Sequence, residues 1–356
     1  MKKIGALTRK GALFSTALFQ WNQNHNNRQM PWKGEKDPYK IWLSEIILQQ
    51  TRVEQGLKYY EKFITAYPNV EALAAAPEEK VFKLWEGLGY YSRCRNLIAS
   101  ARVVSEVHKG KFPSTYETIL ALKGVGNYTA AAIASFGYNL PYAVLDGNVF
   151  RVLSRIFGVD TPVDTSTGKT EFTALAQRIL PEGKAGVYNQ AIMDFGALIC
   201  KPVPECRSCF FNRHCAAFLQ GRQDLLPVKE KKIVVKRRWL NYFALEYKAQ
   251  VLIRQRITND IWQQLFEFAL VETDKALSTK ELLELFQKQY AVGGYQFLSE
   301  RTSQQKLTHQ VIHFTILQIK LEQKIDLPGA VWVKRTGLHD YAFPKTLQLF
   351  VMDQYK

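Results

Sequence analysis

The sequence is poor in acidic residues and cysteines, and it has no long hydrophobic run. No stretch approaches the roughly 18 apolar residues that cross a bilayer, so we expect no membrane-spanning helix. Only 32 of the 356 residues are Asp or Glu, against 48 Lys or Arg, which gives a formal net charge of +16. This charge indicates a polyanionic partner, with nucleic acid favoured over an anionic membrane surface. The alternative is a basic protein whose charge only aids solubility.

The chain also lacks internal repeats and low-complexity tracts, and 47% hydrophobic residues argue against disorder. Helical patterns dominate before the Leu225-Leu226-Pro227 break, and β-rich stretches follow it. We therefore expect an all-helical domain over residues 1–215, a linker over 216–238 and a smaller α+β domain over 239–356. The linker contains the densest basic run, Lys229–Arg238. The expected strands include Trp239–Tyr247, Gln250–Thr258 and Val311–Leu321.

The N-terminal segment has some features of a signal peptide. Ser15 and Thr16 interrupt its apolar stretch, however, and no small-residue cleavage site follows. Phe14, Leu18 and Trp21 lie at the spacing of one helical face. The pattern predicts an amphipathic first helix.

Four of the five cysteines lie close together, in the pattern C-x5-C-x2-C-x5-C. Cys200, Cys206, Cys209 and Cys215 can converge on one centre, and without a secretory signal they favour metal binding over disulfides. Zinc and a [4Fe–4S] cluster both accept four thiolates, and the spacing does not decide between them. Cys94 lies in a helical pattern and is expected to be a small buried hydrophobic residue.

A glycine-rich turn separates two helical patterns in Leu122–Thr129, LKGVGNYT. Gly124 and Gly126 let the backbone turn tightly and present free N–H groups at the start of the next helix, Tyr128–Ser135. Such an arrangement binds a phosphate without sequence preference. A plain turn between helices would use the same residues.

Two acidic residues lie in unusual surroundings. Glu45 is the only charged residue in the apolar segment Ile41–Leu48, so we expect it to be buried. Burial raises the pKa of a carboxyl group and suits it to act as a general acid. Asp146 follows an apolar stretch and precedes a helix near Asn148, where an ordinary N-cap is the alternative. An ion pair is the alternative for Glu45, but two carboxylates in different surroundings can also cleave a glycosidic bond.

These features together resemble the adenine DNA glycosylases of the endonuclease III, or helix-hairpin-helix, superfamily. The resemblance implies a helix-hairpin-helix domain that removes adenine mispaired with 8-oxoguanine or guanine from duplex DNA, in the bacterial cytosol, as a monomer. The motifs that carry it are RQMPW from Arg28, PYKIWLSEIILQQT from Pro38, WEGLGYYSRCRNL from Trp85, LKGVGNYTA, LDGNVFRVLSR from Leu145 and YNQAIMDFGALIC ending at Cys200.

The resemblance also implies residue roles. Glu45 matches the acid that protonates N7 of the flipped adenine and then activates water, and Asp146 matches the carboxylate that stabilises the oxocarbenium ion. Tyr128 matches a supporting hydroxyl, and Asn148 lies beside it. Gln50 and Tyr90 match residues inserted into the duplex, although Tyr90, like Leu48, could be an ordinary core residue. The remaining expected DNA-contacting residues are Arg28, Trp32, Leu48, Thr51, Gly124 and Gly126.

In the superfamily the four cysteines hold a [4Fe–4S] cluster that orders a basic loop against DNA. Five residues separate Cys200 from Cys206, one fewer than the usual six, and zinc is the alternative metal. The C-terminal part resembles the family's Nudix-like 8-oxoguanine recognition domain, in which Thr308 and His309 align with a Ser-His pair. No REx2EExG motif occurs between residues 262 and 300, so we expect no Nudix hydrolase activity.

Two rival functions differ from this one in testable ways. A bifunctional endonuclease III-type enzyme, which removes oxidised pyrimidines and cuts the strand, needs a Schiff-base lysine where this chain has Tyr128. Lys123 lies before the glycines, on the other side of the turn. A non-catalytic DNA-damage binding protein would not need both Glu45 and Asp146.

Overall fold

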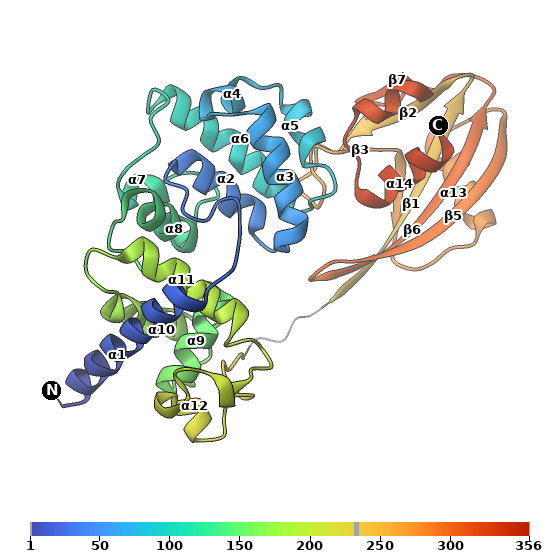
Figure 1. The fold of residues 1–356 in the computed structure, drawn as a ribbon. Helices are drawn as coiled ribbons and strands as arrows, with labels where there is room; N and C mark the ends of the chain where they lie inside the picture. The colour runs from blue at the N-terminus through green and yellow to red at the C-terminus, as the bar shows by residue number, and fades with distance from the viewer. Residues whose placement is uncertain (1, 231–234, 356) are drawn as a thin grey trace. The chain divides into compact units, whose positions relative to one another are not determined.

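The computed structural model describes residues 2–230 and 235–355, and the chain divides into two compact units (Figure 1). The first unit comprises Met1–Ala75 and Asn96–Lys231, and the second comprises Ala76–Arg95 and Lys232–Lys356. The described regular elements of the first unit are helices, and the second contains a β-sheet. The expected fold class, a helical domain followed by an α+β domain, is confirmed. Part of the basic run Lys229–Arg238 falls on residues 231–234, outside the described residues.

Before the cysteines, long helices alternate with a few short ones. They are α1 (Lys2–His25), α2 (Pro38–Leu48), α3 (Val53–Ala66), α4 (Val70–Ala75), α5 (Glu78–Trp85), α6 (Tyr91–Glu106), α7 (Tyr116–Leu120), α8 (Asn127–Tyr138), α9 (Gly147–Phe157), α10 (Ser166–Ile179) and α11 (Ala185–Leu198). Two 3-10 turns, Cys206–Ser208 and Asn212–His214, and the short helix α12 (Ala216–Leu219) follow. No described helix is long and apolar enough to cross a membrane.

Helix α2 is buried almost all round, and this determines the surroundings of Glu45. The carboxylate of Asp37 accepts a hydrogen bond from the Tyr39 N–H, and Pro38 occupies the first turn, where no N–H donor is needed. Every residue from Tyr39 to Ile47 except Lys40 is buried. A carboxyl group in the middle of such a helix is therefore removed from bulk water.

The predicted glycine turn joins α7 to α8. Gly124 has a φ of +81°, and a Cβ atom built there would lie 2.6 Å from the Cβ of Asn96, so glycine is required for both reasons. Gly126 is the N-cap of α8, with extended backbone and open space around its Cα. The start of α8 therefore presents free backbone N–H groups.

Helices α1, α9, α10 and α11 enclose one hydrophobic core of the first unit. Phe14, Leu18 and Trp21 are buried in it, which confirms the amphipathic first helix. Phe14 packs edge-on against Phe195 of α11, with ring centroids 6.0 Å apart. Cys94, on α6, is fully buried, as predicted. The core fixes α9 and α11, whose ends line the candidate site.

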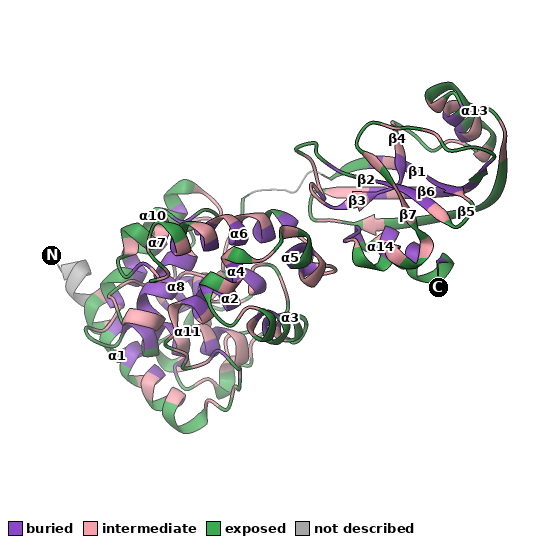
Figure 2. Cartoon of the chain, turned by 90° about the horizontal axis from the view of Figure 1, so that it is seen from above, coloured by how far each residue is buried: buried purple, intermediate pink, exposed green. Residues whose placement is uncertain are grey.

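The sheet of the second unit has the strand order β3-β2-β1-β6-β5, with β4 paired to β1 and β7 to β2. Strand β1 runs parallel to β6, and the other pairs are antiparallel. Figure 2 shows buried residues along the central strands β1 and β6. The elements are β1 (Lys236–Tyr247), β2 (Gln250–Gln255), β3 (Phe266–Glu267), β4 (Ala269–Thr273), α13 (Thr279–Tyr290), β5 (Tyr295–Lys306), β6 (Gln310–Leu321), β7 (Ala330–Lys334), a 3-10 helix (Arg335–Asp340) and α14 (Lys345–Gln354).

The segment Ala76–Arg95 belongs to the second unit by its contacts, although the sequence places it among the helical motifs. Glu86 accepts hydrogen bonds from the Phe343 N–H at 2.9 Å and from the Gln348 side chain at 2.7 Å. Lys83 donates to the carbonyl oxygen of Tyr341 at 3.1 Å. These contacts join the segment to the region around α14.

The close approach of α8 and α11 gives a stability prediction. A Cβ atom at Gly186 would lie 2.6 Å from the backbone oxygen of Ser135, which cannot move without disturbing α8. We expect Gly186→Ala to lower the free energy of unfolding by about 1–3 kcal/mol, measured by urea titration. Gly137→Ala is the matched control, because its Cβ would meet atoms no nearer than 3.5 Å. That substitution should leave stability equal or raise it by about 0.5 kcal/mol. Equal effects of the two would contradict the packing argument.

Candidate functional site

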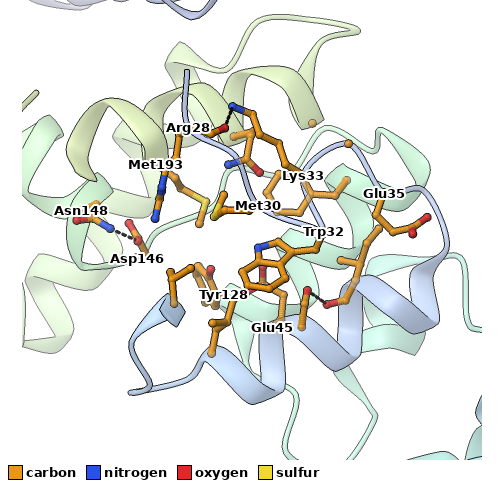
Figure 3. Close-up of a pocket in the computed structure, with 18 of the residues that line it drawn as sticks. Arg28, Met30, Trp32, Lys33, Glu35, Glu45, Tyr128, Asp146, Asn148 and Met193 are labelled. Atoms are coloured by element: carbon orange, nitrogen blue, oxygen red, sulfur yellow. Dashed lines mark hydrogen bonds between the residues drawn. The ribbon is translucent and has the colours of Figure 1, made fainter. Parts of the chain in front are cut away.

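A cavity of about 660 Å³ lies in the first unit, between α2, α8, α9 and α11 (Figure 3). This central cavity has the size of a small-molecule site. The residues predicted from the sequence that line it are Arg28, Trp32, Glu45, Leu48, Gln50, Thr51, Tyr128, Asp146 and Asn148. The fold therefore brings these side chains, distant in sequence, to one hollow.

Glu45 faces the cavity from the buried side of α2 and is 7% exposed. Burial raises its pKa from the ordinary 4.5 to about 7; Tyr128, as a hydrogen-bond donor, opposes this shift, and the charge of Asp146 adds to it. The carboxyl group therefore carries a proton near neutrality. This agrees with the burial predicted from the sequence.

The N-cap role, which the sequence left as the alternative for Asp146, is present in the structure. Asp146 is the N-cap of α9: Oδ1 accepts from the Val149 N–H at 2.7 Å, and Oδ2 accepts from the Asn148 side chain at 2.8 Å. It also lines the cavity. Burial raises its pKa, and the donors at Val149 and Asn148 act in the opposite direction. Since these donors favour the charged form, Asp146 differs electrostatically from Glu45.

Tyr128, in the first turn of α8, lies against Glu45, as Figure 3 shows. Burial and the two neighbouring carboxylates raise the pKa of its hydroxyl well above the usual range. The hydroxyl therefore stays protonated and can serve as a donor in the cavity.

The wall of the cavity contains an ion cluster that the sequence reasoning missed. Asp194, on α11, is fully buried and pairs with Arg28 at 2.9 Å and with Lys33 at 3.1 Å. Its carboxylate also accepts from the side chains of Asn26 and Gln190 at 2.8 and 3.0 Å. Asp194 thus fixes Arg28 at the cavity. It is the only acidic residue of an apolar helix, the same signal that identified Glu45.

Arg151 was also missed by the sequence reasoning. It donates to the side-chain oxygen of Asn148 at 2.9 Å and to the carbonyl oxygens of Gly196 and Cys200 at 2.7 Å each. It therefore connects the start of α9 to the first cysteine. Its position, five residues after Asp146 on a strongly amphipathic helix, gave no specific signal.

Gln50 and Tyr90, the residues expected to enter a duplex, both have left-handed backbones, with φ of 55° and 50°. Such conformations cost free energy in non-glycine residues and are found at functional sites. Gln50 is exposed at the rim of the central cavity, just after α2. Tyr90 is 45% exposed and therefore is not an ordinary core residue, the alternative left open by the sequence. Leu48 is partly buried and lines the central cavity.

Tyr90 lines a second cavity, of about 540 Å³, within the second unit. Thr308 and His309 line it too, and both are exposed. The hydroxyl oxygens of Tyr90 and Thr308 are 2.8 Å apart, a hydrogen bond in which either can donate. The fold thus places the predicted Thr308-His309 pair beside one predicted duplex-contacting residue.

The four cysteines of the pattern surround one further cavity, and all have free thiols. The segment Cys200–Cys215, the cysteine loop, is held by the buried Arg155, whose guanidinium donates to the carbonyl oxygens of Lys201 at 2.5 Å and Pro202 at 2.9 Å. Burial raises the pKa of Cys200, Cys206 and Cys209, and mutual repulsion adds to it. A positively charged centre would stabilise the thiolates.

Four thiols around one cavity are donors that both a [4Fe–4S] cluster and a zinc ion accept. Zinc bonds thiolate sulfur at about 2.3 Å, so its four ligands nearly touch. Among residues 2–230 and 235–355, no three Cys, His, Asp or Glu side chains are placed to hold one metal ion.

Comparison with known proteins relates both units to described domains. Residues 43–179 match the HhH-GPD superfamily of base excision DNA repair proteins, and residues 241–352 match the NUDIX domain. The adenine DNA glycosylase of Buchnera aphidicola subsp. Schizaphis graminum is 30% identical over 347 residues, covering 94% of this chain and 97% of the relative. That of Buchnera aphidicola subsp. Baizongia pistaciae is 35% identical over 258 residues, covering 72% of this chain and 73% of the relative.

Solved structures give the same picture for the helical part. A thermostable thymine-DNA glycosylase is similar with a TM-score of 0.55 and 30% identity, covering 60% of this chain and 98% of its own. A trapped endonuclease III–DNA covalent intermediate is similar with a TM-score of 0.51, covering 59% of this chain and 98% of its own. Its identity of 19% supports the shared fold alone.

The raised pKa of Glu45 gives a prediction about stability. The folded protein keeps this proton up to a pH of about 7, whereas the unfolded chain loses it near 4.5, so Glu45 destabilises the fold increasingly as the pH rises through this window. Glu45→Gln should therefore raise the free energy of unfolding by up to about 3 kcal/mol at pH 8 and by less at pH 5.5. Chemical denaturation at both pH values measures this.

Glu54→Gln is the control, because it removes a carboxylate at the exposed start of α3. The difference between the two variants isolates the effect of burial. A gain from Glu45→Gln that does not grow with pH would contradict the burial of an ionisable group at this position.

Proposed function

The chain belongs to the adenine DNA glycosylase family of base excision repair, and from this premise we propose that it hydrolyses the N-glycosidic bond of adenine mispaired with 8-oxoguanine or guanine. The observation that carries this proposal is the pairing of Glu45 with Asp146 at one cavity in different electrostatic surroundings. Cleavage of a glycosidic bond needs a proton donor and a carboxylate that faces positive charge. The cavity provides a candidate for each.

Glu45 is the proposed acid. An adenine anion is a poor leaving group, and a proton placed on N7 converts it to a neutral one. A carboxyl group whose pKa is about 7 carries that proton at working pH and releases it readily. Once deprotonated, Glu45 can accept a proton from the attacking water. The hydroxyl of Tyr128 donates to Glu45 and orients it.

Asp146 is the proposed stabiliser of the sugar cation. The Val149 N–H and the Asn148 amide donate to its two oxygens, hold it in place and favour its charged form. An oxocarbenium ion next to a fixed carboxylate in a partly dry cavity is stabilised far more than in water. Arg151, through Asn148, supports this arrangement.

The adenine must leave the base stack before it reaches the cavity. Gln50 is the proposed wedge at the cavity rim, and Arg28, Trp32, Leu48 and Thr51 are proposed to line its path. Tyr90, Thr308 and His309, which share the second cavity, are proposed to contact 8-oxoguanine. The second unit would then read the lesion without Nudix hydrolase activity.

We propose that the protein removes the base and does not cut the DNA strand. A lyase needs an uncharged lysine amine at the sugar. Of the lysines that line the central cavity, Lys33 is tied to the Asp194 carboxylate and donates to the Arg28 carbonyl oxygen at 3.0 Å. Lys36 donates to the carbonyl oxygen of Phe136 at 3.0 Å. Lys123 does not line the cavity. Tyr128 occupies the position where the bifunctional enzymes carry lysine.

A [4Fe–4S] cluster held by Cys200, Cys206, Cys209 and Cys215 is the proposed cofactor. Bound there, it supplies a charged cross-link that orders the cysteine loop. Arg207 and Arg213, both exposed on this loop, are then available to phosphates. The free N–H groups at the start of α8, after Gly126, are a second proposed phosphate contact. We propose duplex DNA as partner, a monomeric state and a cytoplasmic location.

Substitution of the acid tests the chemistry. Glu45→Gln keeps the shape but cannot donate the proton, so adenine release should fall at least about 100-fold, while duplex binding remains. Single-turnover assays with A:8-oxoguanine, A:G, A:C and T:G duplexes measure this. The unchanged protein should act on the first two only. Glu54→Gln is the matched control, because its carboxylate is exposed on α3.

Three outcomes would overturn the proposal. Turnover by Glu45→Gln at the normal rate would remove this residue from the chemistry. Efficient borohydride trapping of the enzyme on DNA would reveal a Schiff base and favour the bifunctional rival. Release of thymine in place of adenine would show that the protein acts on a different base.

Metal analysis tests the cluster. The purified protein should contain iron and inorganic sulfide in cluster stoichiometry and show broad visible absorption. Cys206→Ser should lose both, whereas Cys94→Ala should keep them, because Cys94 lies on α6, away from the cysteine loop. Zinc without iron in anaerobically purified protein would contradict the assignment.

A further inference from the structure

Arg238 differs in exposure from the other described residues of the basic run Lys229–Arg238. Lys236 and Arg237 are exposed, as expected for residues that contact phosphate, whereas Arg238 is 8% exposed. It begins the buried part of β1. Its guanidinium group therefore pairs with side chains of the second unit, as the hydrogen bonds below show.

The guanidinium of Arg238 is paired on two sides. It donates to the carboxylate of Glu272 at 2.6 and 2.7 Å and to that of Asp260 at 3.0 and 2.7 Å. A fifth contact, at 3.3 Å, reaches the side-chain oxygen of Gln310. Two-pronged pairs of this kind fix direction as well as distance, which a lysine cannot reproduce.

Two of these partners belong to the wall of the second cavity. Asp260 lies in the loop between β2 and β3, which lines the cavity with Trp262. Gln310 directly follows Thr308 and His309, and its carbonyl oxygen accepts from the Leu307 N–H at 2.7 Å. Arg238 therefore forms hydrogen bonds to both of these loops, each of which lines the second cavity.

The loop of Asp260 depends on such contacts. Trp262 and Gln264 have left-handed backbones, with φ of 61° and 71°, a conformation that costs free energy in non-glycine residues. Arg256 holds the same loop by two hydrogen bonds. It donates to the carboxylate of Asp260 at 3.0 Å and to the Ile261 carbonyl oxygen at 3.2 Å. Glu272, in contrast, lies on β4, which the backbone already pairs with β1.

We propose that Arg238 is a positioning residue for lesion recognition: it fixes the Asp260–Trp262 loop and the Thr308-His309 turn relative to each other and so sets the shape of the second cavity. This rests on the proposed function, in which that cavity contacts 8-oxoguanine. The residue acts through its partners and touches no DNA. Its loss therefore lowers the preference for 8-oxoguanine over guanine without changing the salt dependence of DNA binding.

The experiment compares Arg238→Met with Arg237→Gln. Single-turnover rates of adenine release opposite 8-oxoguanine and opposite guanine give the preference, and dissociation constants for the same duplexes over a salt series give the number of phosphate contacts. Arg238→Met should reduce the preference about tenfold, with the slope against salt unchanged. Arg237→Gln should weaken binding to both duplexes alike, with a shallower slope and the preference intact.

Two further variants separate positioning from folding. Arg238→Lys keeps the charge but not the fork, and should lose the preference as Arg238→Met does. Gln310→Leu leaves both ion pairs of Arg238 intact and removes only the hydrogen bond from Arg238 to the Thr308-His309 turn. This variant therefore tests the proposal even if the Arg238 variants do not fold. A normal preference in soluble Arg238→Met or Gln310→Leu overturns the proposal. An unchanged protein that fails to release adenine from either duplex overturns the proposed function instead.

Discussion

The burial of α2 almost all round is the constraint on which the candidate active site depends. Glu45 has a pKa near 7 because the helix that carries it is buried between neighbouring helices. The core around α1, α9, α10 and α11 holds α9 and α11, so that Asp146 lines the cavity and Asp194 holds Arg28 at it. Each of these acids has its own donors. Packing thus raises the pKa of Glu45 and Asp146, and the donors to Asp146 act against this shift.

Much of the site could be predicted from local sequence signals. A single acid in an apolar helix indicated Glu45, and an acid directly before a helix indicated Asp146. The glycines at 124 and 126 predicted a tight turn, which the φ of +81° at Gly124 confirms. These features depend on neighbours within a few residues, so sequence periodicity and capping rules detect them. The roles of the residues came from family resemblance and stay proposals.

Other features depend on partners far along the chain. Asp194 meets Arg28 across 166 residues, and Arg238 meets Gln310 across 72 residues. In sequence, Arg238 looks like any other charge of a solvated basic run, and only the sheet reveals that it is buried. The grouping of Ala76–Arg95 with the C-terminal unit has the same origin, because Glu86 finds its partners beyond residue 340. No local pattern encodes such pairs.

The N-cap position of Asp146 and its proposed catalytic role together restrict which amino acids can occupy position 146. The cap of α9 would tolerate Ser, Thr or Asn, whose side chains also accept from the Val149 N–H. The proposed chemistry would tolerate only a carboxylate, and glutamate is a poor cap. Aspartate is the one residue that meets both requirements, capping α9 and supplying a carboxylate. Under the proposed chemistry, every substitution at position 146 therefore weakens either the cap of α9 or the reaction.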